Sequence, residues 1–439
     1  MAIWRNRNEA TQPSGSPSRR RVLCGALLAA FVLVVAPAHV TAQREAAAAI
    51  DTCFDCHRHT LNDDPSMGFR DDIHRTRGLS CAACHGGDPT AEDMPDAMSP
   101  ARGFIGVPRR AQIPQLCARC HADAAFMRGY NPSLRTDQFS QYLTSVHGQR
   151  LRQGDTRVAV CTDCHSVHGI RPASSPTSSV HPLTLPETCG RCHADTARME
   201  SYKIPTDQAA DYRASVHFKT LEGGDLAAPT CATCHGNHGA APPGVASIER
   251  VCGTCHVFQE QLFDQSPHKA AWDALGFPSC LTCHGNHRIE ATGDFLIGTG
   301  DKSFCVTCHS QGEPGWEAAG KIHTSLTGLD AALQHSDAIL DRAERAGMEV
   351  ADAKVVQSSG REQLIKARVE VHTVTPPRIE GITAAGLKLA AQAQQAGEEA
   401  LSELAFRRKG LALSLIIIAL VVLGIWLLIR ELEARKPAR

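Results

Sequence analysis

Aromatic residues are scarce in this chain of 439 residues: Phe, Trp and Tyr together make up 5% of it, and only four residues are Trp. The length allows two or three domains of about 150 residues, but the composition argues against an ordinary aromatic-rich core. An excess of one charge is also lacking, because 45 basic residues nearly cancel 46 acidic ones. This balance argues against a disordered polyelectrolyte and against a nucleic-acid partner.

The alternating apolar and polar pattern of a β-strand is absent as well. Gly- and Pro-rich joints such as GNHGAAPPG (236–244) separate short stretches of the chain, as expected of short helices joined by loops. The sequence therefore predicts a mostly α fold with extensive loops. Something other than hydrophobic side chains must organise its core.

Cysteine and histidine, in contrast, are abundant, with 19 Cys and 22 His. Eighteen of the cysteines fall into nine copies of C-x-x-C-H. Two thiols at this spacing match the two vinyl groups on one edge of a porphyrin, and the adjacent His is placed under the iron as its proximal ligand. The sequence thus predicts nine covalent c-type haems. The cysteines are Cys53, Cys56, Cys81, Cys84, Cys117, Cys120, Cys161, Cys164, Cys189, Cys192, Cys231, Cys234, Cys252, Cys255, Cys280, Cys283, Cys305 and Cys308, and the proximal histidines are His57, His85, His121, His165, His193, His235, His256, His284 and His309.

Two other uses of cysteine are less consistent with this pattern. Disulfides are the default for many cysteines in an exported protein, but a disulfide framework does not put His after every second Cys. Structural zinc needs closed sets of four ligands, and nine identical half-sites are an odd number to pair.

A second set of histidines supplies candidates for the distal iron ligands. Four of them follow an aromatic residue by five positions, four lie close behind a motif, and one follows the last motif. These nine predicted distal ligands are His59, His74, His147, His168, His217, His238, His268, His287 and His323. Three further histidines are alternatives, His181, His335 and His372, and the last is the preferred substitute.

The histidines that trail a motif should ligate a neighbouring haem. Residues three apart on a helix lie on one side of it, roughly 5–6 Å apart, whereas the two axial positions of an iron face opposite sides of a wide ring. His168 therefore cannot readily cap the haem that His165 holds, and the same holds for His238 and His287. Such cross-ligation would join the haems into a compact stack.

These motifs repeat as a larger unit, which consists of a leading His, a motif with a trailing His, and a second motif. Residues 147–193 (unit 2), 217–256 (unit 3) and 268–309 (unit 4) follow this order. Residues 74–121 (unit 1) are a looser copy, with Asp88 where the trailing His is expected. We therefore expect a nonahaem domain over residues 43–316, in which porphyrin makes most of the core.

The two ends of the chain indicate where it works. Arg19, Arg20 and Arg21 lead into 14 mostly apolar residues (22–35), and small residues follow at 36–42, so residues 1–42 are predicted to be an export signal, with an uncleaved anchor as the alternative. Residues 410–429 are 20 residues without a charge, enough for a helix to cross about 30 Å of hydrocarbon. We predict one C-terminal transmembrane helix there, with a cytoplasmic tail at 430–439.

Residues 317–409 contain no haem motif. Apolar residues recur at broadly helical spacing at Leu326, Leu329, Leu333, Ile339 and Leu340, and again at Leu387, Leu389, Leu401 and Leu404. The prolines at 376 and 377 should interrupt this pattern. The region is predicted to be a helical hairpin beside the haem domain, whose last helix is a stalk that enters the membrane.

Over residues 50–325 the chain resembles the multihaem c-type cytochromes, more closely those with doubled C-x-x-C-H motifs. The resemblance implies covalent haem c, mostly bis-histidine irons of low potential, and electron transfer across or along the cell envelope. In function more than in layout, the chain is also similar to the NapC/NirT type of membrane-anchored quinol dehydrogenase, which has an N-terminal anchor and fewer haems.

Three functions are compatible with these patterns. The favoured one is an electron carrier in the bacterial inner membrane with its haem domain in the periplasm, which links a quinol-oxidising membrane partner to a periplasmic or outer-membrane cytochrome or reductase. The rival is a multihaem reductase or oxidase of small nitrogen or sulfur oxyanions with one open iron position. A haem-rich scaffold of a larger respiratory complex is the third. The carrier is favoured because every motif ends in His and the twelve distal candidates exceed the nine irons.

Overall fold

A computed structural model describes residues 51–239 and 248–434. The predicted export signal (1–42) and the last five residues of the predicted tail lie outside the described residues. The described ranges contain helices, turns and loops but no β-strand, which confirms the mostly α fold.

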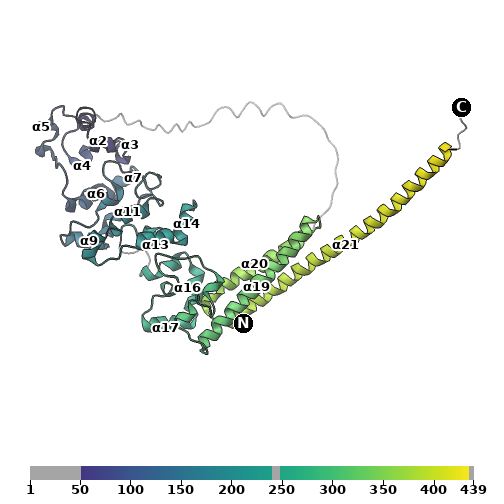
Figure 1. Cartoon of the computed structure of the whole chain (residues 1–439). Coiled ribbons are helices and arrows are strands. Elements are labelled where there is room, and N and C mark those ends of the chain that lie inside the picture. The colour runs from purple at the N-terminus through teal and green to yellow at the C-terminus, as the bar shows by residue number, and fades with distance from the viewer. Residues whose placement is uncertain (1–50, 240–247, 435–439) are drawn as a thin grey trace, which may run out of the picture. The chain divides into compact units, whose positions relative to one another are not determined.

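The first part of the described chain consists of short helices, and three long helices follow it (Figure 1). The α-helices are α1 Thr52–Asp55, α2 Asp64–Phe69, α3 Ile73–Thr76, α4 Ala82–His85, α5 Met94–Ala97, α6 Ile113–His121, α7 Ala124–Arg128, α8 Gln138–Thr144, α9 Val146–Arg152, α10 Cys161–His165, α11 Leu185–His193, α12 Thr196–Met199, α13 Gln208–Ala214, α14 Val216–Glu222, α15 Cys231–His235, α16 Val257–Asp264, α17 Pro267–Leu275, α18 Leu281–His284, α19 Pro314–Arg345, α20 Ala351–Glu370 and α21 Pro376–Ala434. The π-helix η1 is Cys56–Leu61, and the 3₁₀ turns are η2 Pro100–Arg102, η3 Arg110–Gln112, η4 Glu200–Tyr202, η5 Ile248–Arg250, η6 Cys252–Thr254, η7 Asp294–Leu296, η8 Cys305–Thr307 and η9 Val371–Thr373.

A serine corner precedes the leading histidine in units 2 and 3. Ser145 has extended backbone angles, so α8 ends before it, and its hydroxyl accepts a hydrogen bond from the Gly148 N–H at the start of α9. Ser215 does the same between α13 and α14. A serine at this position is a strong helix N-cap. The corner therefore fixes where the helix that carries the leading histidine begins.

A tyrosine braces each of these corners. The Tyr142 hydroxyl donates to the Ala159 carbonyl at 2.8 Å, and the Tyr212 hydroxyl donates to the Pro229 carbonyl at 2.8 Å. Both acceptors lie just before the C-x-x-C-H segment of the same unit. The same hydrogen bond therefore ties the leading helix to the motif in both repeats.

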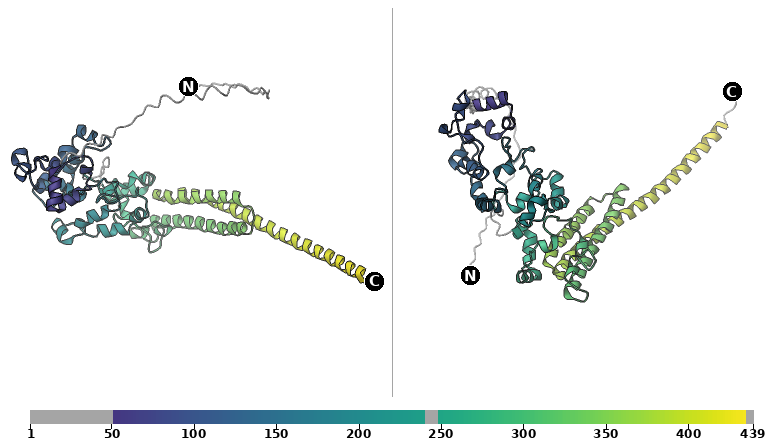
Figure 2. Two further views of the ribbon diagram at one scale, coloured as in Figure 1. Left: turned by 90° about the horizontal axis from the view of Figure 1, so that it is seen from above. Right: turned by 60° about the vertical axis from the view of Figure 1, so that its left-hand side comes forward.

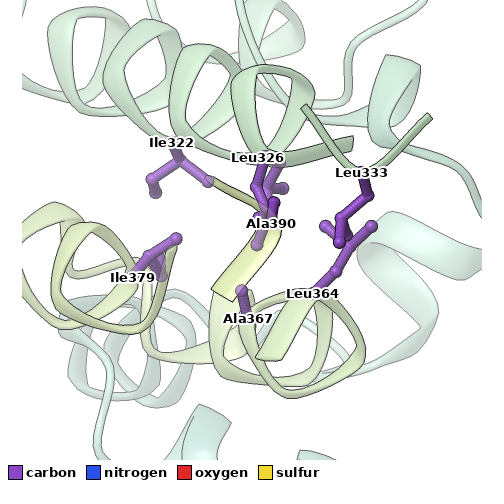
Figure 3. Close-up of a cluster of buried hydrophobic side chains, with 8 residues drawn as sticks. Ile322, Leu326, Leu333, Leu364, Ala367, Ile379 and Ala390 are labelled. Atoms are coloured by element: carbon purple, nitrogen blue, oxygen red, sulfur yellow. The ribbon is translucent and has the colours of Figure 1, made fainter. Parts of the chain in front are cut away.

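Helices α19, α20 and the first part of α21 pack side by side along their lengths (Figures 1 and 2). Their core contains Leu326, Leu329 and Leu333 from α19, which are nearly inaccessible to solvent, together with Leu364 and Ile379 (Figure 3). Burial of such side chains is the main source of stability for a bundle that has no haem motif of its own.

This region differs from the predicted hairpin in two respects. It contains three helices rather than two, because α20 intervenes between α19 and α21. The buried seam of α21 consists of Ile379, Thr383, Gly386, Ala390, Ala393 and Gly397. Leu387, one of the apolar residues that recur at helical spacing, lies outside this seam and is 41% exposed. Small residues are needed here because a Cβ on Gly386 would lie 2.6 Å from the Leu329 side chain. The predicted break at Pro376 is confirmed, since α21 begins there.

The second half of α21 extends beyond its partner helices (Figure 2). It contains residues 410–429, whose side chains are exposed, and it is long and apolar enough to cross a membrane. A surface of this length made of Leu, Ile and Val suits lipid rather than water. The helix fits a membrane anchor.

Candidate haem-binding site

The cysteines and histidines of all nine motifs line one continuous cavity of about 4100 Å³. The motifs in α4, α10, α15 and α18 each form a single helical turn, and those in α6 and α11 form the C-terminal end of a longer helix. On a helical turn the two cysteines lie on one side and the adjacent histidine next to them, so they can approach one porphyrin edge together. The two cysteines and the histidine of a motif are thus placed to hold a large planar group together.

A sharp turn follows several motif histidines. Gly86, Gly236 and Gly285 have φ values of 70°, 77° and 69°, and Ser166 has the same sign at 69°. These backbone angles belong to the region that favours glycine. At Gly86 a side chain would also collide with the backbone, because a Cβ would lie 2.0 Å from the Gly103 carbonyl oxygen. The turn leads the chain, and any trailing histidine on it, away from the motif that precedes it.

Eight of the nine motif histidines lie opposite a second imidazole. Two imidazoles that bind one iron from opposite sides, each at a metal–nitrogen distance of about 2 Å, have ring centroids roughly 6 Å apart. The eight pairs have centroid distances of 5.9 Å for His74–His121, His85–His168 and His235–His287, 6.0 Å for His165–His238 and His268–His309, 6.1 Å for His147–His193, 6.2 Å for His284–His372 and 6.3 Å for His217–His256. The residues present therefore fit eight bis-histidine haems.

The pairs follow two rules. The leading histidine of a unit faces the second motif of the same unit, as His147 faces His193. The trailing histidine faces the first motif of the preceding unit, as His238 of unit 3 faces His165 of unit 2. Unit 4 has no following unit, and its first motif histidine, His284, faces His372 of the turn η9. Units 2, 3 and 4 thus each complete a site in the unit before, as the geometric argument for His168, His238 and His287 predicts.

The structure brings seven of the nine predicted distal histidines opposite a motif histidine: His74, His147, His168, His217, His238, His268 and His287. The other two, His59 and His323, face no motif histidine within the described ranges, and the alternative His372 takes a place opposite one. The Nδ1 of His323 lies 3.1 Å from the Asp294 carbonyl oxygen. The assignment of His323 thus gives way to His372, because the bundle folds back onto unit 4.

The remaining two alternative ligands, His181 and His335, have other surroundings. His181 is 4% exposed, and its Nδ1 accepts a hydrogen bond from the Leu183 N–H at 3.3 Å. His335 lies on the exposed side of α19. The pairing rule itself was the signal that could have identified His372, since it requires one more trailing histidine after unit 4.

Burial favours the neutral form of ten of these imidazoles. Desolvation lowers the pKa of ten paired histidines: His121, His147, His165, His168, His193, His217, His235, His238, His268 and His284. A neutral imidazole has a nitrogen lone pair available for a metal, whereas the protonated form does not. The buried environment therefore favours the ligand form.

Hydrogen bonds at Nδ1 orient several of these rings. The Nδ1 of His85 lies 2.8 Å from the Gly106 carbonyl oxygen, and the Nδ1 of His74 lies 2.9 Å from a carboxylate oxygen of Asp72. When Nδ1 carries the proton and donates it to such a partner, Nε2 is left free to bind iron.

Asp72 has a second partner from another unit. Its other carboxylate oxygen accepts the Ile170 N–H at 2.7 Å, two residues after His168. A Cβ on Gly68 would lie 2.2 Å from the His168 carbonyl oxygen, so only glycine fits at that approach. The corner between α2 and α3 thus fixes both His74 and the segment that carries His168.

Comparison with protein families adds an independent observation. A family model described as Cytochrome c3 matches residues 73–194, which extend from just before His74 to just after His193 and include four of the nine motifs. This segment is similar to the multihaem c-type cytochromes of that family. The family implies covalently bound haem c and electron transfer between haems. Comparisons of the chain with curated proteins and with solved structures gave no match.

Proposed function

We propose that this cytochrome carries electrons through nine covalently bound haems. The observation that supports the proposal most directly is the series of eight imidazole pairs with centroid distances between 5.9 and 6.3 Å, each including one motif histidine. When haem is bound, its iron accepts and donates single electrons without other chemistry by the protein. The chain's contribution is to hold the rings, keep the imidazoles neutral and set the potentials.

The cross-unit pairing gives the carrier a continuous path. In units 1 to 3 the first haem is held by cysteines from one unit and by a histidine from the next, so neighbouring units share a site. All nine motifs also line the same cavity. Sites joined in this way are kept at fixed, short separations, which electron transfer between haems requires. The last shared site, His284 with His372, connects the path to the helical bundle and so to the anchor.

We further propose that the anchor lies in the bacterial inner membrane and that the haem domain lies in the periplasm. The apolar residues 410–429 and the export signal expected at 1–42 support this arrangement. A quinol-oxidising membrane subunit would then be the electron donor, and a periplasmic or outer-membrane cytochrome or reductase the acceptor.

The mass of the purified protein and a haem count test the central proposal. Nine haems per chain are expected, together with reduction by a quinol analogue in native membranes that is lost after the protein is purified away from its partner. A colourless protein, or a mass equal to the bare polypeptide, would refute the proposal. Reduction of the purified cytochrome by quinol alone would remove the need for a partner.

A further inference from the structure

The first motif stands apart from the other eight. His57 is the only motif histidine that faces no second imidazole in the part of the chain that the structure describes. The pairing rule explains this difference. In units 1 to 4 the leading histidine lies 39 to 47 residues before the motif histidine that it faces. At the same spacing, a leading histidine for His57 would lie within residues 10–18, and that stretch contains no His.

The histidines left after the pairs are accounted for do not offer an evident substitute. These are His39, His59, His181, His323 and His335. His181 accepts the Leu183 N–H at Nδ1, His323 lies beside Asp294 and Gly298, and His335 is exposed on α19. His59 lies two residues after His57 in the same π-helix, so it cannot readily reach the opposite side of the ring that His57 would support. His39 lies outside the described residues and inside the predicted export signal.

Hydrogen bonds hold the His57 ring in a position suited to an axial ligand. Its Nδ1 lies 2.5 Å from one carboxylate oxygen of Asp63, and the other oxygen accepts the Ser66 N–H at 3.1 Å as the N-cap of α2. The Ser66 hydroxyl donates to the His57 carbonyl oxygen at 3.1 Å. A carboxylate partner fixes the ring and raises the basicity of Nε2. The His57 side of the site is therefore organised, although no second imidazole faces it.

We propose that the haem site formed by Cys53, Cys56 and His57 keeps an exchangeable sixth iron position that binds a small neutral ligand. This inference rests on the proposed haem loading of all nine motifs. The eight paired sites have both axial positions filled by protein, so ligand exchange is confined to this end of the series.

The charge around the site favours a neutral ligand over an anion. Residues 51–72 contain six acidic residues and two basic ones. Glu92 and Asp93 line the same cavity, and the segment that precedes them is joined to the first motif by hydrogen bonds from Thr52 to the carbonyl oxygens of Pro89 and Ala91. Negative charge at this density lowers the local concentration of anions such as nitrite or sulfite. It has little effect on an uncharged diatomic ligand.

Carbon monoxide, added to the reduced full-length protein, is the probe, and low-temperature EPR of the oxidised protein is the second measurement. We expect one CO bound per nine haems and one high-spin ferric signal per chain. The double variant Cys53→Ser/Cys56→Ser should contain eight haems and lose both CO binding and the high-spin signal. The matched variant Cys305→Ser/Cys308→Ser should also contain eight haems but keep both.

The outcomes separate this inference from the proposed function. Nine haems that are all low-spin and bind no CO would overturn the inference alone, since another protein group would then fill the position. CO binding that persists after removal of Cys53 and Cys56 would also overturn it. A wild-type haem count below nine would instead overturn the nine-haem premise. If a cysteine variant fails to mature, the CO stoichiometry and the EPR spectrum of the wild-type protein still test the inference.

Discussion

The imidazole of His372 lies opposite that of His284, with ring centroids 6.2 Å apart and ring planes 29° apart. The two residues belong to different parts of the fold, since His284 ends α18 in the haem-motif region and His372 lies in the turn η9 between two helices of the bundle. The Nδ1 of His372 lies 2.8 Å from the Val369 carbonyl oxygen, which orients the ring. The bundle therefore supplies the imidazole opposite His284 as well as the apolar helix that fits a membrane anchor.

Replacement of His372 should open that site. In His372→Ala we expect one haem to change from low-spin to high-spin, because the iron held by His284 loses its second imidazole. EPR should show one additional high-spin ferric signal per chain, and the reduced protein should bind one additional CO. His323→Ala is the matched control and should change neither quantity. Equal effects of the two substitutions would contradict the assignment of His372.

Asp72 should lower the reduction potential of one haem. It takes the place that Ser145 and Ser215 occupy in units 2 and 3, and its carboxylate contacts the Nδ1 of His74, which faces His121. A negative partner stabilises the oxidised iron, so Asp72→Asn should raise one potential by on the order of 50 mV, where about 59 mV is a tenfold change for one electron.

The control for this prediction is the neighbouring carboxylate Asp71. It is exposed and pairs with Arg70 and Arg171, so Asp71→Asn makes the same change of charge without contact to a ligand. Spectroelectrochemical titration of both variants measures the effect. An equal shift in both would show that the effect is one of net charge and not of the hydrogen bond to His74.

The core of the bundle should be sensitive to truncation of Leu329. This side chain is 0% exposed, and Leu→Ala at such sites costs about 2–5 kcal/mol of unfolding free energy. Leu387→Ala, at a side chain that is 41% exposed, should cost within about 0.5 kcal/mol of zero. Urea unfolding of the detergent-solubilised protein, followed by far-ultraviolet circular dichroism, compares them. A larger loss for Leu387→Ala would contradict the described seam.

The repeated tyrosines should make the haem domain sensitive to high pH. Burial raises the pKa of both Tyr142 and Tyr212 to about 12, compared with about 10 for an unfolded tyrosine. The neutral phenol is thus favoured in the folded state, so its stabilising effect is complete below pH 10 and is lost as the pH rises toward 12.

Substitution by Phe tests this pH dependence. Tyr142→Phe and Tyr212→Phe should each cost about 1 kcal/mol at neutral pH, where a hydrogen bond to Ala159 or Pro229 is lost. The double variant should lose less stability than the wild type between pH 10 and 12. Thermal unfolding across this range measures both effects. Parallel stability curves for the two proteins would show that other groups control the alkaline transition.

The anchor should be separable from the haem sites. A stop codon in place of Gly410 removes the apolar residues 410–429 but keeps the buried seam of α21, which ends at Gly397. The truncated protein should move from the membrane fraction to the soluble periplasmic fraction, with an unchanged haem count. Continued membrane association would point to attachment through another segment or a partner.

The haem-attachment residues and the apolar helix at 410–429 could be predicted without the fold, because both predictions depend on short-range patterns. Two cysteines and a histidine on one helical turn are neighbours whatever the rest of the chain does, and an uncharged stretch such as 410–429 is apolar in any fold. The four leading histidines were also evident, since an aromatic residue precedes each of them at the same distance. The short helices and loops followed from the Gly- and Pro-rich joints.

The pairing of the imidazoles, in contrast, depends on how distant parts of the chain pack together. His85 and His168, or His284 and His372, are separated by more than 80 residues, and their contact depends on how corners and helices pack. The sequence pattern favoured His323, with His372 as a substitute, but the bundle places the former beside Asp294 and the latter opposite His284. The small-residue seam of α21 could not be predicted from the sequence either. A glycine or alanine is recognised as buried only when the fold shows that a neighbour such as Leu329 fills the space beside it.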